Sequence, residues 1–218
     1  MNNNFKGEQI IQKNELIISP SAEKNMLPIV DLVSKNLIKS GKSLEIASGS
    51  GQHIVQLASL LPNYIWQPTD VDQNRINSIN HRTKDNIHKN IKQACYLDAT
   101  QEGWSLDYPN QNCILLINLL HLISWEKTKT LVNETFQSLA LNGILIIYGP
   151  FMRDGKLTSK GDIEFHKNIL ENDPTLGYKD DKEVITLLLK LGITHSETVK
   201  MPANNLAFIF QKLTNSLS

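Results

Sequence analysis

The chain has 218 residues, with 22 Lys and Arg against 22 Asp and Glu, so its formal net charge is zero. Hydrophobic residues make up 40% and charged residues 20%, as in ordinary soluble globular proteins. A chain of this length can form one well-packed domain. The charge balance argues against a strongly basic nucleic-acid platform.

The sequence also argues against a membrane protein and against a zinc protein. No apolar run approaches the ~20 residues that span a bilayer, and the polar residues 1–6 lack the apolar core of a signal peptide. The two cysteines, Cys95 and Cys113, are too few for a disulfide scaffold and lack the CxxC spacing of zinc sites. We therefore expect a cytoplasmic protein with no bound metal and no membrane segment.

Residues 1–16 are polar and are predicted to form a loose arm, followed by a single domain over residues 17–218. Ser19 and Pro20 favour the start of a helix that continues to about residue 41. Strands and helices then alternate. The predicted strands are 43–47, 64–69, 94–98, 113–117 and 144–148, and the predicted helices are 52–61, 71–88 and 125–139.

The Leu-Asn-Gly stretch 141–143 is expected to turn into the strand at 144–148. The last third predicts helices at 162–171 and 181–191, then strands at 194–201 and 206–211. These last two strands are too close for a helical crossover and should be antiparallel. The order predicts an α/β fold with a Rossmann-like, doubly wound sheet of seven strands. The sheet should be mostly parallel, with an antiparallel C-terminal strand and helices on both faces.

The stretch from Leu44 to Gly51 is the most informative part of the chain. Glu45 lies near the end of a predicted buried strand, and Ala-Ser-Gly-Ser-Gly leads directly into a helix. Glycines allow a ligand to approach the backbone, and in open α/β sheets ligands bind beyond the carboxyl ends of the strands. On its own, this turn is equally consistent with an ordinary glycine-rich connection.

Two further acids follow at the ends of the next strands. Asp70 comes about twenty residues after Gly51, where the ribose of a bound nucleoside falls in this architecture. A carboxylate there can accept hydrogen bonds from both ribose hydroxyls. Asp98, at the end of the third strand, could accept a hydrogen bond from an adenine amino group. Glu45, Asp70 and Asp98 together predict a nucleoside site.

A nicotinamide-dependent oxidoreductase is the competing hypothesis. Its fingerprint, Gly-x-Gly-x-x-Gly, requires a third glycine, but Ile54 occupies that position. No Gly-Lys-Ser/Thr follows the loop, which excludes a phosphate-binding P-loop.

The stretch from Leu44 to Gly51 resembles the cofactor loop of class I S-adenosylmethionine-dependent methyltransferases. Ala47 takes the place of the first glycine that this loop usually has. The resemblance implies S-adenosylmethionine as cofactor and S-adenosylhomocysteine as product. It implies that Asp70 binds the ribose, Asp98 lies on the adenine side and Asn118 lies near the methionine moiety. The implied cofactor residues are Glu45, Ala47, Ser48, Gly49, Gly51, His53, Asp70, Val71, Asp98, Ala99 and Asn118.

The resemblance extends to a small methyltransferase-like family of unassigned substrate, whose animal members are called methyltransferase-like twenty-six proteins. Its blocks occur in order between about residues 19 and 210: Ser-Pro-Ser-Ala-Glu-Lys-Asn at 19–25, Ser-Gly-Ser-Gly-Gln-His at 48–53, Trp-Gln-Pro-Thr-Asp at 66–70, Tyr-Gly-Pro-Phe at 148–151 and Met-Pro-Ala-Asn-Asn at 201–205. The family implies a fold and a cofactor without a substrate.

Methyl transfer mainly requires alignment of donor and acceptor and exclusion of water. A general base is needed only if the acceptor must lose a proton. The catalytic candidates are His121 and Tyr148, and each also has a structural interpretation. Residues that could contact substrate are Asn25, His121, Tyr148, Phe151, Asn204 and Asn205. His81 and His88 lie on a polar helix with Arg82, and we expect them to be solvated.

The acceptor stays open. The chain lacks the Asp/Asn-Pro-Pro-Tyr/Phe motif used on nucleobase amino groups, and no cysteine follows the fourth strand as a cytosine nucleophile would. The partner is expected to be a small molecule or an undefined acceptor, with no strong nucleic-acid signature, and the oligomeric state is not predicted. A catalytically silent S-adenosylmethionine-binding module or partner subunit is an alternative to an active methyltransferase.

Overall fold

The computed structural model describes residues 11–13, 16–37, 39–85 and 89–213. The chain divides into two compact units, Met1–Asp98 and Ala99–Ser218, which are described in turn. Most of the predicted arm (1–10 and 14–15), and the expected end of the helix at 71–88 with His88, lie outside the described residues. Within the described parts of the chain, none of the helices has the length and apolar character needed to cross a bilayer.

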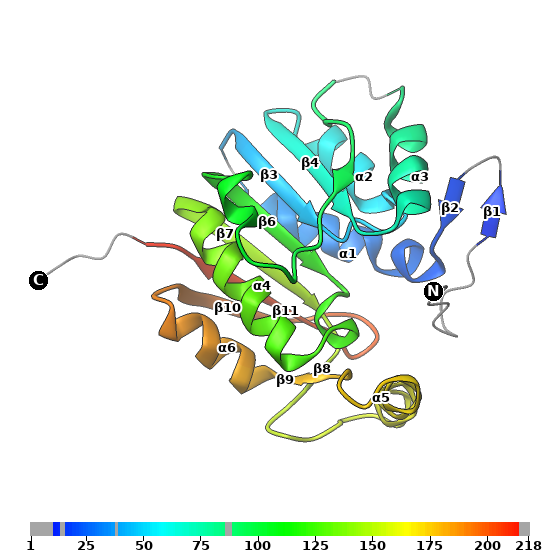
Figure 1. Cartoon of the computed structure of the whole chain (residues 1–218), viewed down its shortest axis with the longest axis vertical. Coiled ribbons are helices and arrows are strands. Elements are labelled where there is room, and N and C mark those ends of the chain that lie inside the picture. Colours follow the sequence, from blue (N-terminus) through cyan, green and yellow to red (C-terminus); the bar gives the residue numbers. More distant parts are fainter. Residues whose placement is uncertain (1–10, 14–15, 38, 86–88, 214–218) are drawn as a thin grey trace, which may run out of the picture. The chain divides into compact units, whose positions relative to one another are not determined.

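The first unit begins with a short antiparallel hairpin of β1 (Ile11–Lys13) and β2 (Leu16–Ile18). Strands and helices then alternate, and all of them except β5 are labelled in Figure 1. They are α1 (Pro20–Asn36), β3 (Gly41–Ile46), α2 (Gln52–Leu60), β4 (Tyr64–Asp70), α3 (Gln73–Thr83) and β5 (Cys95–Tyr96). Strands β3, β4 and β5 are parallel and adjacent in that order.

Local signals explain where the helices of this unit begin. Ser19 caps α1 by accepting from the Ala22 N–H at 3.3 Å, and Pro20 is the first helical residue. Asp72 caps α3 by accepting from the N–H groups of Asn74 and Arg75. The helix predicted from residue 71 therefore begins at Gln73.

The second unit contains η1 (Trp104–Leu106), β6 (Gln111–Ile117), η2 (Leu120–Leu122), α4 (Trp125–Ser138), β7 (Leu139–Gly149), β8 (Phe151–Met152), α5 (Lys160–Asn172), β9 (Lys179–Asp180), α6 (Asp181–Lys190), β10 (Thr194–Lys200) and β11 (Leu206–Gln211). Its four sheet strands run in the order β10-β11-β7-β6. Helices α4 and α6 pack side by side (Figure 1).

The pairing directions agree with the sequence. Strands β6 and β7 are parallel, whereas β11 is antiparallel to both β7 and β10. The chain thus contributes seven strands to a mostly parallel sheet, with an antiparallel C-terminal pair, which confirms the predicted α/β class. The run from Cys113 to Leu116 is fully buried, as expected for a strand covered on both faces.

The turn expected at residues 141–143 is present as a tight bend inside β7 (Leu139–Gly149). A Cβ added to Gly143 would lie 2.8 Å from the Ala140 carbonyl oxygen. The pairing with β6 shifts from Leu139 opposite Gln111 to Ile144 opposite Cys113. Asn142 adopts a φ of 62° within this irregularity, so the Asn-Gly pair forms a bulge and does not end the strand.

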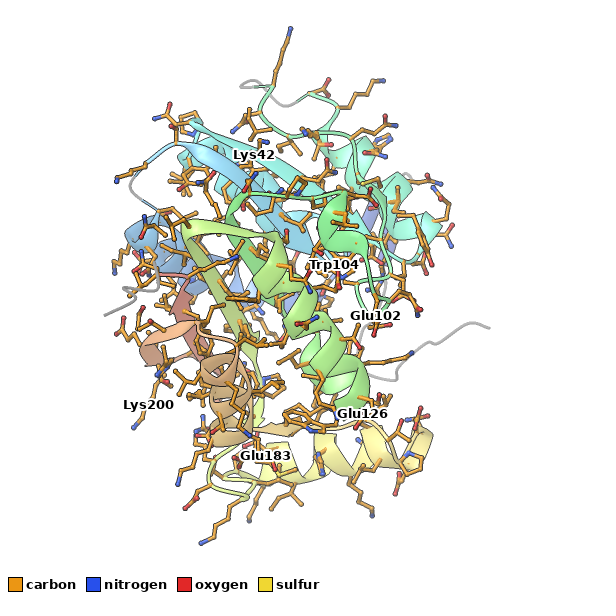
Figure 2. The ribbon with its side chains drawn as sticks, turned by 60° about the vertical axis from the view of Figure 1, so that its left-hand side comes forward. Lys42, Glu102, Trp104, Glu126, Glu183 and Lys200 are labelled. Carbon is orange, nitrogen blue, oxygen red and sulfur yellow. The ribbon has the colours of Figure 1, made fainter. Side chains whose placement is uncertain are left out.

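Charged side chains are exposed at several positions of the second unit. Glu183 on α6 and Lys200 at the end of β10 are exposed and point away from the unit in Figure 2. The same figure labels Trp104, whose indole is buried and donates to the Ala99 carbonyl at 3.0 Å. Trp104 therefore anchors the start of this unit, where one expected cofactor residue lies.

Candidate nucleoside site

The loop between β3 and α2 has an unusual backbone. Ala47, Gly49 and Gly51 all have positive φ angles, of 56°, 60° and 74°. A Cβ added to Gly51 would lie 3.0 Å from Ile79 Cγ1, so α3 packs directly against the loop at that point. A Cβ on Gly49 would meet only the Ala47 carbonyl, at 4.0 Å. Within the described residues, the loop therefore leaves open space above Gly49.

Hydrogen bonds tie this loop to the end of β4. The Ser48 N–H donates to the Thr69 carbonyl at 2.8 Å, and the Ser48 hydroxyl donates to the Glu45 carbonyl at 3.1 Å. The Gly49 N–H donates to Asp70 Oδ2 at 2.9 Å. The predicted ribose acid and the predicted glycine loop are therefore in direct contact.

The structure brings the three predicted acids to one edge of the first unit. Glu45 is opposite Pro68 in the β3–β4 register, and Asp70 is opposite Tyr96 in the β4–β5 register. Asp98 follows two residues after β5. The carboxyl ends of the three parallel strands thus meet at the same edge, as the sequence pattern predicted.

Glu45 and Asp70 are both deeply buried carboxyl groups. Glu45 is 1% exposed, and its Oε2 atom has no hydrogen-bond partner among the described residues. Desolvation raises the pKa of Glu45 to about 8, the Ser48 hydroxyl opposes that shift, and the charge of Asp70 adds to it. Burial also raises the pKa of Asp70, against the backbone N–H of Asp72, the charge of Arg75 and the N–H of Gly49.

His53 and Asn25 form a buried pair beside the loop. His53 Nε2 lies 2.9 Å from Asn25 Oδ1. Because Oδ1 can only accept, Nε2 carries the proton and Nδ1 is left as an acceptor. Burial lowers the pKa of His53 to about 4, so the ring is neutral at physiological pH. Two expected site residues from different helices are therefore in contact.

Arg82, Gln52 and Ser50 support the loop in a way that we did not predict from the sequence. Arg82 donates to the Ser50 carbonyl at 3.0 Å and to the Ile17 carbonyl at 2.8 Å. Gln52 Oε1 accepts from the Ser19 N–H and from the Ser50 hydroxyl. The residues just before α1 are thereby fixed onto the glycine loop. The sequence did contain a signal for the role of Arg82: it follows Ile79, which is buried, by three residues and therefore lies on the same face of the helix.

The remaining cofactor residues of this unit differ in exposure. Val71 is exposed directly after Asp70, and Asp98 is partly buried. The Leu97 N–H donates to the Asp70 carbonyl at 3.1 Å, which keeps the chain before Asp98 beside the end of β4.

In the second unit, Asn118 and Tyr148 are neighbours across the β6–β7 pair. Asn118 has a φ of 54°, and its N–H donates to the Tyr148 carbonyl at 2.8 Å. A Cβ on Gly149 would lie 3.7 Å from Asn118 Oδ1. The Tyr148 hydroxyl accepts from Asn205 Nδ2 at 3.0 Å. Three expected site residues therefore lie together at this end of the strands.

His121 is buried among aromatic rings. Its ring centroid lies 5.7 Å from that of Phe165 and 6.3 Å from that of Tyr178. Desolvation, followed by the charge of Lys179, lowers the pKa of His121 to about 3. The ring is therefore neutral and a weak base at physiological pH.

Lys179 is a buried residue with no signal in the sequence. Its ammonium donates to the Ile123 carbonyl at 2.6 Å and to the Gly177 carbonyl at 2.9 Å. Burial lowers its pKa to about 8. The Gly177 N–H in turn donates to the His121 carbonyl at 3.0 Å. Lys179 thus links the carbonyls of Ile123 and Gly177 and stabilises the turn after β6, where His121 lies.

Asn204 forms hydrogen bonds with three other residues. Its side-chain amide donates to Thr158 Oγ1 at 2.8 Å and to Asp162 Oδ2, and its carbonyl accepts from Arg153 at 2.8 Å. Tyr178 donates to the other oxygen of Asp162 at 3.3 Å. Asp162 on α5 therefore links that helix to the loop between β10 and β11.

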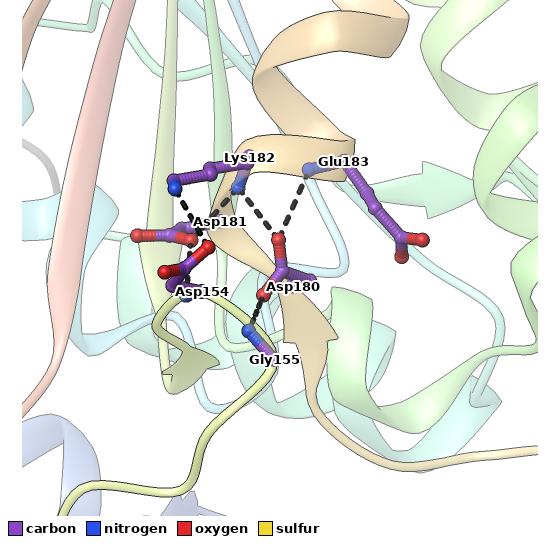
Figure 3. A network of polar contacts seen from close by, with 6 residues as sticks. All are labelled: Asp154, Gly155, Asp180, Asp181, Lys182 and Glu183. Atoms are coloured by element: carbon purple, nitrogen blue, oxygen red, sulfur yellow. Dashed lines mark hydrogen bonds and ion pairs between the residues drawn. The ribbon is translucent and has the colours of Figure 1, made fainter.

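Phe151 is fully buried, with its ring centroid 4.6 Å from that of Phe208. The segment that follows is held by the network in Figure 3, where Asp180 caps α6 and Lys182 bonds Asp154 at 2.6 Å. Backbone N–H groups of Asp154 and Gly155 donate to the Asp181 and Asp180 carboxylates. The carboxylates of Asp154, Asp180 and Asp181 each have a hydrogen-bond or ion-pair partner within this network, so the cluster holds the turn at residues 154–155 against the start of α6.

Several solved methyltransferase structures are similar in fold to this chain. An O-methyltransferase family protein from Burkholderia thailandensis matches with a TM-score of 0.74 at 14% identity, over 87% of this chain and 56% of that one. Human N-acetylserotonin methyltransferase, solved with S-adenosylmethionine, matches with a TM-score of 0.65 at 16% identity, over 85% of this chain and 52% of that one. This chain spans little more than half the length of these two proteins.

The N-methyltransferase NodS from Bradyrhizobium japonicum matches with a TM-score of 0.64 at 18% identity, over 89% of this chain and 98% of that one. These likenesses show that the chain shares its fold with these three proteins. A family model described as "Protein of unknown function (DUF938)" matches residues 17–212. The chain belongs to this family.

Proposed function

We propose that the chain is an S-adenosylmethionine-dependent methyltransferase acting on a small-molecule acceptor. The observation that carries the proposal is the buried carboxyl of Glu45, whose Oε2 has no partner among the described residues, beside a loop that is open above Gly49. A buried polar atom without a partner is costly. A ligand that supplies a hydrogen-bond donor at this position would remove that cost.

The residues present fit the cofactor. Glu45 offers an acceptor to an ammonium group, and the open space above Gly49 allows a ligand to approach the backbone. The Asp70 oxygens accept from Gly49 and Asp72, but a carboxylate has about four acceptor sites, so ribose hydroxyls can still bind. The other residues assigned to the cofactor are Ala47, Ser48, Gly51, His53, Val71, Asp98, Ala99 and Asn118.

When bound, S-adenosylmethionine supplies an electrophilic methyl group on a sulfonium, and S-adenosylhomocysteine is the product. The protein's part is to align the acceptor and exclude water. We assign acceptor contacts to Asn25, His121, Tyr148, Phe151, Asn204 and Asn205. The low pKa of His121 favours a positioning role over proton transfer at neutral pH.

Support for a small acceptor comes from the relatives. The name of the human enzyme gives N-acetylserotonin as its substrate. The order of sequence blocks between residues 19 and 210 supports, as part of the same proposal, a relation to the methyltransferase-like twenty-six proteins.

Ligand binding tests the proposal. S-adenosylhomocysteine at a hundredfold over its dissociation constant should stabilise the fold by about 2.7 kcal/mol. Asp70→Ala should weaken that binding far more than His121→Ala. No thermal shift and no calorimetric heat with either S-adenosylmethionine or S-adenosylhomocysteine would refute the proposal. Binding of a nicotinamide dinucleotide without binding of S-adenosylhomocysteine would indicate an oxidoreductase.

Transfer itself needs a separate assay. Radiolabelled methyl groups should appear in metabolite pools incubated with the chain and labelled S-adenosylmethionine. Tight binding with background transfer would instead indicate a silent binding module.

A further inference from the structure

Lys179 is a buried cation with no anionic partner among the described residues. It is 7% exposed, and its ammonium donates to two neutral acceptors, the carbonyls of Ile123 and Gly177. A buried charge is normally paired with a charge of opposite sign, and an ammonium has three N–H donors. One donor and the positive charge of Lys179 are therefore available to a ligand.

The acids that the fold places around Lys179 are engaged by other groups. Asp180 follows Lys179 in β9, and successive side chains of a strand point to opposite faces. Asp180 instead caps α6 and accepts from the Gly155 N–H, as Figure 3 shows. Asp162 on α5 accepts from the Tyr178 hydroxyl and from two further side chains. Neither acid forms an ion pair with Lys179.

A second polar group without a partner lies beside this cation. His121 is 6% exposed, and neither of its ring nitrogens has a hydrogen-bond partner among the described residues. The charge of Lys179 contributes to the lowered pKa of His121, so the two side chains are close enough to interact. A neutral imidazole carries one N–H donor. Lys179 and His121 thus each have an unused donor in the same part of the second unit.

Aromatic rings flank His121 and leave apolar surface beside it. Phe165 on α5 is 38% exposed, although its ring centroid lies 5.7 Å from that of His121 and 6.1 Å from that of Tyr178. Phe151 is opposite Lys179 in the β8–β9 register, and α5 lies next to these two strands in Figure 1. A ligand held by Lys179 would therefore meet an aromatic surface with its apolar part.

We propose that Lys179 and His121 form a carboxylate-binding subsite, and that the acceptor of the methyl group is a small aromatic acid. A carboxylate supplies the single negative charge that Lys179 lacks, with one oxygen for the ammonium and one for the His121 N–H. A phosphate monoester would bring more negative charge than this one cation balances. The ring of the acid packs against Phe165. The inference rests on the proposed function, because it names the class of its acceptor.

A matched pair of probes tests the charge of the ligand. The probes are 4-hydroxybenzoate and 4-hydroxybenzamide, which have the same ring and hydroxyl but differ in charge. Each is titrated by calorimetry at pH 7 into the wild-type chain saturated with S-adenosylhomocysteine. The acid should bind about tenfold tighter than the amide, or more, because a hydrogen bond to a charged group is stronger than one to a neutral group.

Two lysine variants test the position of the charge. Lys179→Met removes the charge and keeps an unbranched side chain, so it should bind the two probes equally. Lys182→Met is the matched control, because Lys182 is an exposed lysine three residues further along, and it should keep the preference for the acid. A measurement on the wild type avoids any loss of folding in Lys179→Met. In the ¹⁵N spectrum of lysine-labelled chain, 4-hydroxybenzoate should shift one ammonium resonance, and the amide should shift none.

The outcomes separate the two proposals. Equal affinity of the wild type for the two probes, no binding of either, a preference that Lys179→Met retains, or no shifted ammonium resonance overturns the subsite. Each of these results leaves the proposed function intact as long as S-adenosylhomocysteine binds. Failure of the wild-type chain to bind S-adenosylhomocysteine overturns the proposed function and, with it, the role of the acid as methyl acceptor.

Discussion

The substitution Glu45→Gln should stabilise the ligand-free chain increasingly as the pH rises. The amide has the shape of the carboxyl but cannot ionise. Because the folded-state pKa of Glu45 is raised to about 8, its carboxyl contributes stability that is fully present below pH 4.5. That contribution is lost as the pH rises through 8. The wild-type chain should therefore lose stability over a range where the variant does not.

The magnitude follows from the shift. A pKa raised from 4.5 to about 8 corresponds to about 5 kcal/mol of unfolding free energy in total. Most of this, on the order of 3 kcal/mol, is lost between pH 5 and pH 8. The amide also brings a second N–H donor into the site, but that penalty does not vary with pH. The change in the difference between variant and wild type isolates the carboxyl.

Urea unfolding at pH 5, 6, 7 and 8 measures this difference. Glu102→Gln, at an exposed position labelled in Figure 2, serves as the matched control for removing a surface carboxyl. The difference in unfolding free energy between Glu45→Gln and wild type should grow in favour of the variant by an amount on the order of 3 kcal/mol over this range. Parallel curves for Glu45→Gln and wild type would show that Glu45 is ionised in the folded chain and would refute the reasoning.

Three other substitutions test the surroundings of the site. Ala47→Gly relieves a φ of 56° and should stabilise the chain by about 1 kcal/mol, seen as a higher urea midpoint; a lower midpoint contradicts the strain. Arg82→Gln removes the bonds to the Ser50 and Ile17 carbonyls. It should cost about 2 kcal/mol and weaken S-adenosylhomocysteine binding in calorimetry, whereas unchanged affinity would exclude a role in fixing the loop. His121→Phe keeps a ring but does not titrate. Because the folded pKa of about 3 lies below the usual 6.5, the wild type should lose about 3 kcal/mol relative to the variant from pH 7 to pH 4 in urea titrations.

The part of the site nearest the glycine loop could be predicted from the sequence because its signals are local. Glu45 lies in an apolar run, and Asp70 and Asp98 follow strands at regular spacing. In parallel strands, these positions meet at one edge whatever the rest of the chain does. The register between β3, β4 and β5 confirms that arrangement.

Features fixed by distant contacts could not be predicted. Asn142 and Gly143 form the bend that their composition predicts, but its hydrogen bonds could not be predicted. The Asn142 N–H donates to the Lys212 carbonyl at 2.6 Å, and the Lys212 N–H donates to the Gly143 carbonyl at 3.0 Å. This pairing joins residues about seventy positions apart, so the local sequence does not reveal it.

The second unit shows the same limit for side chains. Adjacent asparagines at 204 and 205 were expected to contact substrate, but nothing in the sequence indicates that Asn204 bonds Thr158 and Asp162. Lys179 is similarly an ordinary surface residue type that the fold buries among carbonyls. Identifying such partners requires the three-dimensional arrangement.

Ala47 in the glycine loop and Glu45 at the end of β3 raise the free energy of the ligand-free chain for different reasons. Ala47 holds a left-handed backbone conformation, which concerns the loop alone, whereas Glu45 holds a buried acid, which a bound cation would relieve. Both Ala47→Gly and Glu45→Gln should therefore stabilise the free chain at pH 8, but only Glu45→Gln should weaken binding of S-adenosylhomocysteine. Equal loss of affinity in both variants would mean that the loop conformation, and not the carboxyl, selects the ligand. Stability gained at the expense of binding in Glu45→Gln alone would identify this carboxyl as part of the ligand site.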